Sequence, residues 1–370
     1  MRTVGVEEEL LVIDPRTWSV TSRAREVLKE HADHHGGGRG SASEQIDKEL
    51  FRHQLEIRSD PTRDVGDLWG QVVAARRTAG EAAAARELAV AACATVPLGV
   101  EEPEVSSDDR YRDMVDRFGA VSLMGSTCGL HVHIGIDSED EGVACLDRIA
   151  PWLPVLLAMS TNSPFSSGRD TGYASWRTQM WSSWPSAGPS EAFGTPEGYR
   201  RACDRMIASG AARDRGMLYW DARLSDGQPT LEVRVLDVVT DPEDTALLAA
   251  LVRSLVETAS ERWHAGDPPD VWRSEELRAA RWRAARDGLA GRLLDPATHE
   301  LRPAADVVAS LRALVGDRLS AAGDTDRVDA GIERVLAGTG AARQRAAYER
   351  TGSVEGVVAD LVARTADSWS

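Results

Sequence analysis

The chain has 370 residues, of which 42% are hydrophobic and 28% charged, so it can form one large domain or two ordinary ones. A formal net charge of -16 argues against a nucleic-acid-binding surface, which requires a basic patch. No apolar run approaches the roughly 20 residues that span a bilayer, and we recognise no secretion signal, so we expect no membrane partner. Four scattered cysteines without a C-x-x-C pair are typical of reduced thiols and favour a cytoplasmic location.

Hydrophobic patterns and turn residues predict the secondary structure of the first half. In chain order they indicate a strand at 4–13, a turn at Asp14-Pro15, a short strand, a helix near 22–31, a glycine-rich loop at 31–40, a strand at 55–58, a long helix at 64–95, a short strand at 96–99, a helix near 108–118 and a strand within 125–137. We expect the three histidines of the glycine-rich stretch to lie in a flexible loop, because glycines provide no rigid frame for metal ligands.

The second half is mostly helical. In chain order the patterns predict a helix at 141–162 broken near Pro151 and Pro154, a long loop at 163–195, a helix near 196–210, paired strands at 219–223 and 230–237, and helices at 241–264, 272–290, 303–321 and 326–366. We therefore expect a single α+β domain over residues 1–370. Its sheet-containing core is at 1–265, and a helical extension at 266–370 packs on this core.

Three consecutive glutamates interrupt the first predicted strand. Alternation along a strand places Glu7 and Glu9 on one face and Glu8 on the other. Two carboxylates on one face repel each other unless a cation lies between them, and Mg²⁺ or Mn²⁺ prefers such oxygen ligands. An edge strand with its glutamates in water explains this stretch equally well. For Glu8 we expect an ordinary partner such as an arginine.

A second acidic pair is Glu49 and Glu56. A separation of seven residues places two side chains on one face of a helix, but on opposite faces of an ideal strand. Because the alternation of residues 55–58 favours a strand at Glu56, a bulge or bend is needed for the pair to converge.

The segment G129-L-H-V-H-I-G135 places His131 and His133 on one strand face. An H-x-H pair can bind zinc, but zinc hydrolases need further histidines and usually a lysine downstream. Only His264 and His299 follow, and no lysine occurs after Lys48. The remaining interpretations are a structural histidine pair or, because glycines flank it, close approach of a ligand.

In L231-E-V-R-V-L-D237, Glu232 and Arg234 share a face, whereas Asp237 falls opposite in ideal geometry. Carboxylate and guanidinium form either a simple ion pair or the two halves of a metal and phosphate site. Four predicted strands thus carry polar groups within apolar runs. A protein core tolerates so many only if they meet at one site.

In this order, G5-V-E-E-E9, the acidic residues up to Glu56, T127-C-G-L-H-V-H-I-G135 and L231-E-V-R-V-L-D237 resemble the glutamate–cysteine ligase type 2 family, the YbdK-like carboxylate–amine ligases. N162-S-P-F165 and D170-T-G-Y-A-S-W-R177 match its middle loop. The likeness covers roughly residues 1–265. The serine in Arg58-Ser59-Asp60-Pro61 departs from the more usual Arg-Thr-x-Pro.

The resemblance implies a glutamine-synthetase-like fold, with a curved, mainly antiparallel sheet, an active site on its concave face and helices behind. It implies the cofactors ATP and Mg²⁺ (or Mn²⁺), with the following metal ligands: Glu7, Glu9, Glu49, Glu56 and Glu232. His131, and with it His133, would lie near a metal or a nucleotide phosphate. Arg234 would contact phosphate and, with Glu56, act in catalysis. Sheet curvature or a bulge would bring Glu49 and Glu56 together.

The expected reaction joins a carboxylate, such as the γ-carboxylate of glutamate, to an amino acid or amine through an acyl phosphate. Candidate substrate-binding residues are Arg58, Arg169, Tyr173 and Arg177; for the last three a packed structural loop is the alternative. Asp237 is a guess for the base that deprotonates the amine. A silent nucleotide-binding homologue and a zinc hydrolase are the alternatives in function. We expect small-molecule substrates and a homodimer or larger homo-oligomer.

Overall fold

The structure is a computed structural model that describes residues 1–35, 46–100, 103–106, 108–124 and 126–369. The strands of its central sheet are β1 (Val4–Asp14), β2 (Ser19–Val20), β3 (Ile46–Lys48), β4 (Gln54–Arg58), β5 (Ala89–Ala91), β6 (Gly129–Gly135), β9 (Ala222–Leu224) and β10 (Thr230–Asp237). The main path is β3-β4-β1-β6-β10-β9, and β2 and β5 also pair with β1. The strand pairs of this sheet are antiparallel in the described residues.

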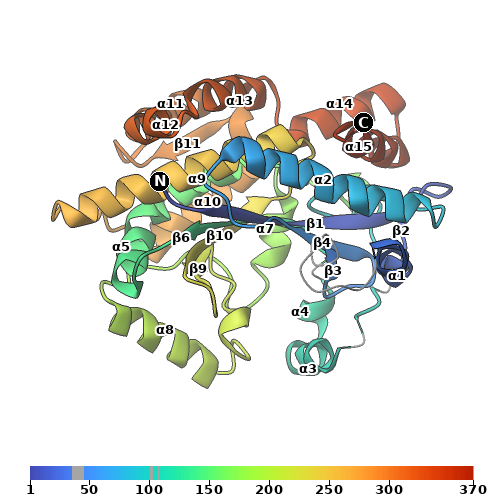
Figure 1. The fold of residues 1–370 in the computed structure, drawn as a ribbon, viewed down its shortest axis with the longest axis horizontal. Helices are drawn as coiled ribbons and strands as arrows, with labels where there is room; N and C mark the ends of the chain where they lie inside the picture. The colour runs from blue at the N-terminus through green and yellow to red at the C-terminus, as the bar shows by residue number, and fades with distance from the viewer. Residues whose placement is uncertain (36–45, 101–102, 107, 125, 370) are drawn as a thin grey trace.

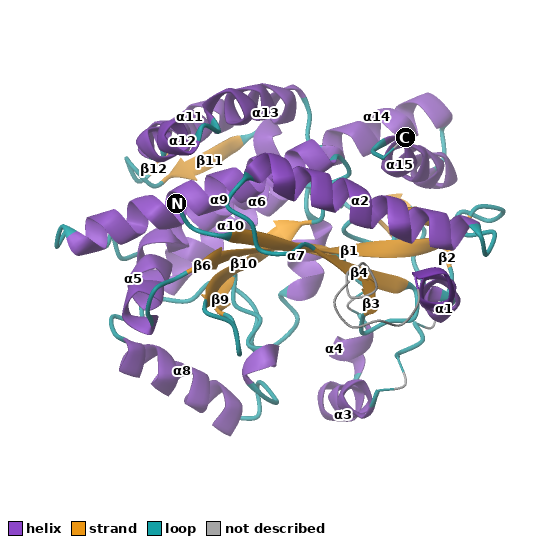
Figure 2. Cartoon of the chain, in the orientation of Figure 1, coloured by secondary structure: helices purple, strands orange, loops and turns teal. Residues whose placement is uncertain are grey.

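Helices cover the sheet on both sides (Figure 2). They are α1 (Ala24–His35), α2 (Val65–Ala84), α3 (Asp109–Phe118), α4 (Ala120–Leu123), α5 (Glu139–Ile149), α6 (Leu153–Ser160), α7 (Trp176–Trp181), α8 (Pro196–Ala208), α9 (Pro242–His264), α10 (Ser274–Asp287), α11 (Ala304–Leu314), α12 (Gly316–Ala322), α13 (Thr325–Ala337), α14 (Gly340–Thr351) and α15 (Val354–Asp367). In Figure 1, α2 and α9 cross one face, and α3, α4 and α8 lie on the opposite side. The predicted α+β class with a mainly antiparallel sheet is confirmed.

The two faces of β1 differ as its alternation predicts. Val4 and Val6 are buried against the layer of α2 and α9, whereas Glu7 and Glu9 point to the other side. Glu8 is fully buried on the helical side and has the arginine partner that we expected. Arg76 of α2 forms two bonds with its carboxylate, at 2.8 and 2.9 Å, and Thr245 of α9 donates a third at 2.6 Å. Glu8 therefore fastens β1 to the helices behind it.

The two large hydrophobic clusters both combine residues of the sheet with residues of the C-terminal helices. Val308, Leu319 and Val335 belong to the same cluster as Val132, and Leu361 belongs to the cluster of Leu11. This shared core supports our proposal of one domain over residues 1–370, with the C-terminal helices packed on the sheet-containing part.

Several predicted boundaries are wrong. The helix predicted at 64–95 ends at Ala84, because Glu87 takes a left-handed conformation (φ 58°) and Ala89–Ala91 then pairs with β1 as β5. No strand forms at 96–99 in the described residues. The stretch 31–35 continues α1, and 36–40 lies outside the described residues. The predicted loop at 163–195 contains the hairpin β7 (Phe165–Ser166) and β8 (Arg169–Asp170), together with α7.

Two further differences lie in the C-terminal part. The hairpin of β11 (Arg292–Asp295) and β12 (Glu300–Pro303) interrupts the predicted helical run. The helix predicted at 326–366 is divided into α13, α14 and α15, and Gly352 ends α14 in a left-handed conformation (φ 73°).

The segment Glu139–Ser160 is long and apolar enough to cross a membrane by length and composition, contrary to our expectation from the sequence. However, 89% of its apolar window is buried inside the structure. Core helices have the same properties, so this segment is weak evidence for a membrane span.

Candidate active site

A cavity of about 250 Å³ lies on the sheet face that carries Glu7 and Glu9. The carboxylates predicted as metal ligands all line it: Glu7, Glu9, Glu49, Glu56 and Glu232. His131, His133 and Arg234 line it as well. The structure thus brings together residues from β1, β4, β6, β10 and the segment after β3.

Strand register explains most of this convergence. Glu7 lies opposite His131 in β6, and Glu9 lies opposite Glu56 in β4. His133 lies opposite Glu232 in β10. Because paired residues on one face are close neighbours, three antiparallel pairings collect these side chains in one place.

A hairpin solves the spacing of Glu49 and Glu56. β3 and β4 are antiparallel neighbours, and Asp47 lies opposite Glu56. Glu49 comes two residues after Asp47 and therefore returns to the same face. We expected a bulge or bend within one element. Instead, the chain reverses between β3 and β4, which the spacing alone did not reveal.

Glu7, His133 and Glu232 form a candidate cation site. One ligand atom from each lies within 4.8 Å of the other two. His133 Nε2 lies 3.7 Å from Glu7 Oε1 and 4.0 Å from Glu232 Oε1, and it is buried without a hydrogen-bond partner in the described part of the chain. His133 Nδ1 contacts Thr230 Oγ1 at 3.1 Å, and such a second contact commonly orients a metal-binding imidazole. Two carboxylates and an unpartnered imidazole nitrogen fit a divalent cation.

His131 lies beside this cluster rather than in it. Its Nδ1 is 3.2 Å from Glu7 Oε2 and 3.5 Å from Arg234 Nη1. Burial and the neighbouring Arg234 lower the pKa of His131, so the ring is neutral at physiological pH. We expect it to orient Glu7.

The carboxylates divide into two electrostatic groups. Burial raises the pKa of Glu49 to about 8, and the nearby Glu9 adds to this effect. Burial also raises the pKa of Glu56, together with Glu7 and Glu49. Such mutual repulsion disappears when a cation binds between the carboxylates. A cation bound near Glu9, Glu49 and Glu56 would relieve this repulsion, although the ligand atoms that lie within 4.8 Å of one another in the described residues are those of Glu7, His133 and Glu232.

For Glu7 and Glu232 the pKa is lowered instead of raised. Burial alone would raise the pKa of Glu7, but its contacts with His131 and His133 lower it below the ordinary value. Burial alone would also raise the pKa of Glu232, but the positive charges of Arg234 and Arg223 lower it below the ordinary value. These contacts favour the ionised form of both carboxylates, which is the form that binds a cation.

Among the cavity residues that the sequence did not reveal, three are polar groups close to the predicted site. Arg223 Nε donates to Glu232 Oε2 at 2.7 Å, and Tyr219 lies beneath the guanidinium of Arg234, 6.0 Å from the ring centroid. Arg110 of α3 lines the cavity and pairs with Asp214. For Arg223 a signal existed, because the predicted hairpin places it opposite Glu232. Arg110 approaches only through the tertiary fold.

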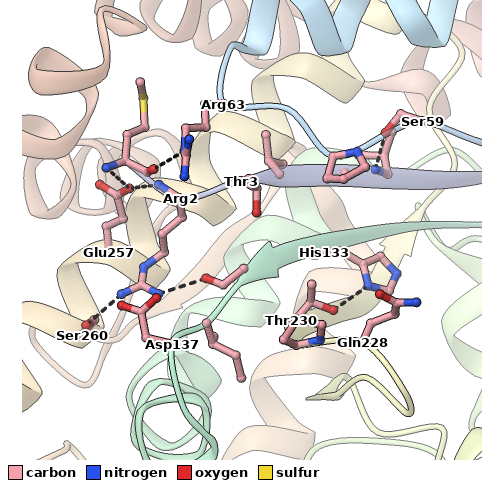
Figure 3. A pocket seen from close by; sticks show the side chains of 18 of the residues that line it. Arg2, Thr3, Ser59, Arg63, His133, Asp137, Gln228, Thr230, Glu257 and Ser260 are labelled. Atoms are coloured by element: carbon pink, nitrogen blue, oxygen red, sulfur yellow. Dashed lines mark hydrogen bonds and ion pairs between the residues drawn. The ribbon is translucent and has the colours of Figure 1, made fainter.

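A larger cavity of about 790 Å³ opens where β1 and β10 begin and β4 and β6 end, and it shares Glu7 and His133 with the first. We call it the edge cavity and the first one the inner cavity. Figure 3 shows the edge cavity between Thr3, which precedes β1, and the pair His133 and Thr230, with Arg2 and Glu257 on its other side. Glu7 and His133 therefore lie at the junction of two adjoining spaces.

The predicted substrate residues take different positions. Arg58 lines the edge cavity, and its Nε is 2.9 Å from Glu56 Oε1. Arg169 is exposed on β8, and the Tyr173 ring lies beneath the guanidinium of Arg286; neither lines the inner or the edge cavity. Arg177 is buried and lines neither cavity. For these last three, substrate binding gains no support from their positions.

Asp237 also lies outside both cavities. It is fully buried and accepts hydrogen bonds from Asn162 N, Ser163 Oγ and Ser175 Oγ at 2.7 to 2.9 Å. A carboxylate engaged in this way cannot reach an incoming amine, so the guess that it is the base is wrong.

Comparison with known proteins adds the family to this geometry. A model of the family "Glutamate-cysteine ligase family 2" matches residues 3–363. The chain belongs to glutamate–cysteine ligase family 2. A protein of Nocardioides sp. named "Putative glutamate--cysteine ligase 2-1" is 57% identical over 372 residues, which cover 100% of this chain and 97% of that protein. One of Streptomyces coelicolor, "Putative glutamate--cysteine ligase 2", is 46% identical and covers 99% of each chain.

Solved structures show the same fold at low sequence identity. A bifunctional glutathione synthetase from Pasteurella multocida superposes with a TM-score of 0.71 at 15% identity, over 100% of this chain and 53% of that one. The glutamate–cysteine ligase of Francisella tularensis gives 0.69 at 13% identity, over 100% and 89%. This chain therefore spans about half the length of the bifunctional protein. The family match and the curated relatives make this member of the family an ATP-dependent carboxylate–amine ligase.

Proposed function

We propose that this family member activates a carboxylate, such as the γ-carboxylate of glutamate, as an acyl phosphate and joins it to an amino acid or amine. The carboxylate attacks the γ-phosphorus of ATP and releases ADP. The amine then attacks the acyl carbon and expels phosphate, which leaves an amide. The observation that carries this proposal is the convergence of the five glutamates, His133 and Arg234 at the inner cavity, which adjoins the edge cavity at Glu7 and His133.

The two cavities match the two groups of substrates. We propose the edge cavity for ATP, because its volume of about 790 Å³ suits a nucleotide and its inner end reaches Glu7 and His133. The structure from Francisella tularensis is a complex with AMP, which supports an adenine nucleotide in this fold. The inner cavity, of about 250 Å³, would then receive the carboxylate and the amine.

Mg²⁺ or Mn²⁺ would be held by Glu7, His133 and Glu232, and by Glu9 with Glu49 and Glu56. Bound there, the cations would neutralise charge on the phosphates and on the carboxylates that converge around them. Zinc is a less suitable occupant, because this oxygen-rich donor set matches the preference of Mg²⁺.

Arg234 would stabilise the negative charge of the transferring phosphoryl group. Its guanidinium lies at the inner cavity between Glu232 and the ring of Tyr219, so its position is defined before substrate binds. Trp181 and Trp184 line the same cavity, and their apolar surface would exclude water from a reactive acyl phosphate.

The test is ADP release in the presence of Mg²⁺, measured against a panel of carboxylates and amines, with mass detection of the amide. We expect release that depends on both substrates in the wild type and its loss in Glu7→Gln. A silent homologue would release no ADP with any pair. A zinc hydrolase would retain zinc after dialysis and act without ATP. Full ADP release by Glu7→Gln would contradict the site.

Two wider expectations remain proposals. A reducing, cytoplasmic location is supported by the four cysteines, all described, buried and free. Assembly as a homodimer or larger oligomer is to be tested by light scattering on the purified chain.

A further inference from the structure

β10 contains a β-bulge at Arg234 and Val235, so the bulge sets the direction of the Arg234 side chain. Its pairing with β6 shifts between Val233, opposite Val132, and Leu236, opposite Leu130. Three steps along β10 thus match two along β6, and Arg234 and Val235 form the irregularity. The shift has a consequence beyond Arg234. Ideal alternation would place Asp237 and Glu232 on opposite faces of the sheet. Because of the shift, Asp237 pairs with Gly129 and Glu232 pairs with His133, so both lie on the same face.

The carbonyl groups of the bulge are satisfied by one side chain. Arg177 Nη2 donates to the carbonyl oxygen of Arg234, and Nη1 donates to that of Val235, both at 3.3 Å. The Arg177 side chain is only 3% exposed, and no ion pair with a carboxylate involves it in the described residues. A buried guanidinium that bonds chiefly to backbone carbonyls is costly, so its position calls for a local reason.

The neighbouring strand leaves room for this guanidinium. A Cβ atom on Gly129 of β6 would lie 2.5 Å from Arg177 Nη2 and 3.2 Å from His131 Nε2. Such distances are shorter than van der Waals contact permits. Glycine at position 129 therefore lets Arg177 reach the bulge beside His131.

The backbone of Arg177 is fixed from the other side. Its N–H donates to Ser163 Oγ at 3.1 Å, and Ser163 donates in turn to the buried carboxylate of Asp237 at 2.7 Å. Ser175, the N-cap of α7, donates to the same carboxylate at 2.8 Å. Asp237 thus anchors the turn that carries Arg177, and the bulge itself brings Asp237 to this face.

We infer that Arg177 is a positioning residue: it holds the bulge carbonyls of β10 and thereby fixes Arg234 against Glu232 at the inner cavity. This inference rests on the proposed ligase chemistry, in which Arg234 contacts the transferring phosphoryl group. It differs from the expectation of the sequence, in which Arg177 binds substrate directly.

Two variants disturb this contact by different routes. Arg177→Lys keeps the charge but cannot serve two carbonyls with a planar fork. Gly129→Ala keeps Arg177 and displaces its guanidinium. We expect both to lower kcat by roughly 100-fold, as for other small misplacements at a reacting centre, with KM for each substrate changed by less than about threefold. Arg177→Lys added to Arg234→Lys should cause little further loss, because both substitutions act through one group.

Arg253→Lys is the matched control. Arg253 is a buried arginine of α9 that donates to the carbonyl oxygen of Arg63 at 2.6 Å and pairs with Asp324, away from the inner cavity. We expect this variant to lose thermal stability as Arg177→Lys does, but to keep the kcat of the wild type. If kcat follows thermal stability across the three variants, Arg177 is merely structural and the inference fails.

Other outcomes are equally decisive. A raised KM for one substrate at unchanged kcat would show direct substrate binding and overturn the inference. Crystal structures of the wild type and of Gly129→Ala provide a readout independent of activity. Loss of the Arg234–Glu232 contact in the variant supports positioning, and an unchanged bulge and contact refute it. If the wild type itself released no ADP with any substrate pair, the proposed function would fail, while these structures would still decide the role of Arg177.

Discussion

Replacing Glu8 by glutamine should destabilise the protein, whereas the same change at Glu7 should not. Glu8 and Arg76 are both 0% exposed, and their two bonds of 2.8 and 2.9 Å are the main compensation for two buried charges. Removing one partner of a buried ion pair costs about 3–5 kcal/mol, because the remaining charge stays buried. Glutamine retains one acceptor oxygen for Arg76, so we expect about 3 kcal/mol, the lower end of this range.

At Glu7 the balance is different. Its side chain is 28% exposed, so solvent screens its contacts with His131 and His133, and neutralising it also relieves the repulsion by which Glu7 raises the pKa of Glu56. We expect its free energy of unfolding to change by less than about 1 kcal/mol. We therefore expect Glu8→Gln to lower stability with activity retained, and Glu7→Gln to abolish activity with stability nearly unchanged.

Thermal unfolding followed by circular dichroism, with urea titration followed by tryptophan fluorescence, measures the difference. A loss of about 3 kcal/mol corresponds to a Tm lower by on the order of 4 °C for a domain of this size. Glu8→Gln, assayed well below its Tm, should still release ADP, and Glu7→Gln should not. Thr245→Val, which removes the third bond to Glu8, is a milder control, with an expected loss of about 1 kcal/mol. Equal Tm values for the two glutamine variants would refute the assignment of opposite faces.

Three further predictions concern pH, the cavity wall and the cation. Burial alone would raise the pKa of Glu141, but hydrogen bonds from Arg2, Ser260 and a backbone N–H lower it to about 2 from an ordinary 4.5. Its stabilising contribution is therefore complete above pH 4.5 and lost as pH falls toward 2, so Glu141→Gln should lose less stability over that range than the wild type in parallel urea titrations. Asp214→Asn breaks the partly exposed ion pair with Arg110 at the inner cavity. We expect KM for the carboxylate or the amine to rise by up to about fivefold, and this KM to depend less on salt concentration than in the wild type. An unchanged KM would show that the ion pair does not shape the cavity. Chelation of divalent cations should abolish ADP release and Mg²⁺ or Mn²⁺ should restore it, whereas turnover that persists in chelator would contradict the cation sites.

Local periodicity was sufficient for the faces of β1. Alternation alone separates Glu7 and Glu9 from Glu8, and burial of Glu8 inside an apolar run requires a basic partner wherever it is found. The order of the polar strand motifs likewise pointed to the family, over roughly residues 1–265. These inferences succeed because side-chain direction along a strand depends only on backbone geometry, which neighbouring residues determine.

What only the tertiary structure decided is which distant segments meet. The hairpin of β3 and β4 brings Glu49 to Glu56, and the bulge of β10 moves Asp237 to the face where it anchors the turn of Arg177. Arg110 reaches the inner cavity through α3 and its pair with Asp214, with no local signal. Pairing register and buried hydrogen bonds between remote segments are set by the free energy of the whole packed chain. A local pattern of residues therefore cannot specify them.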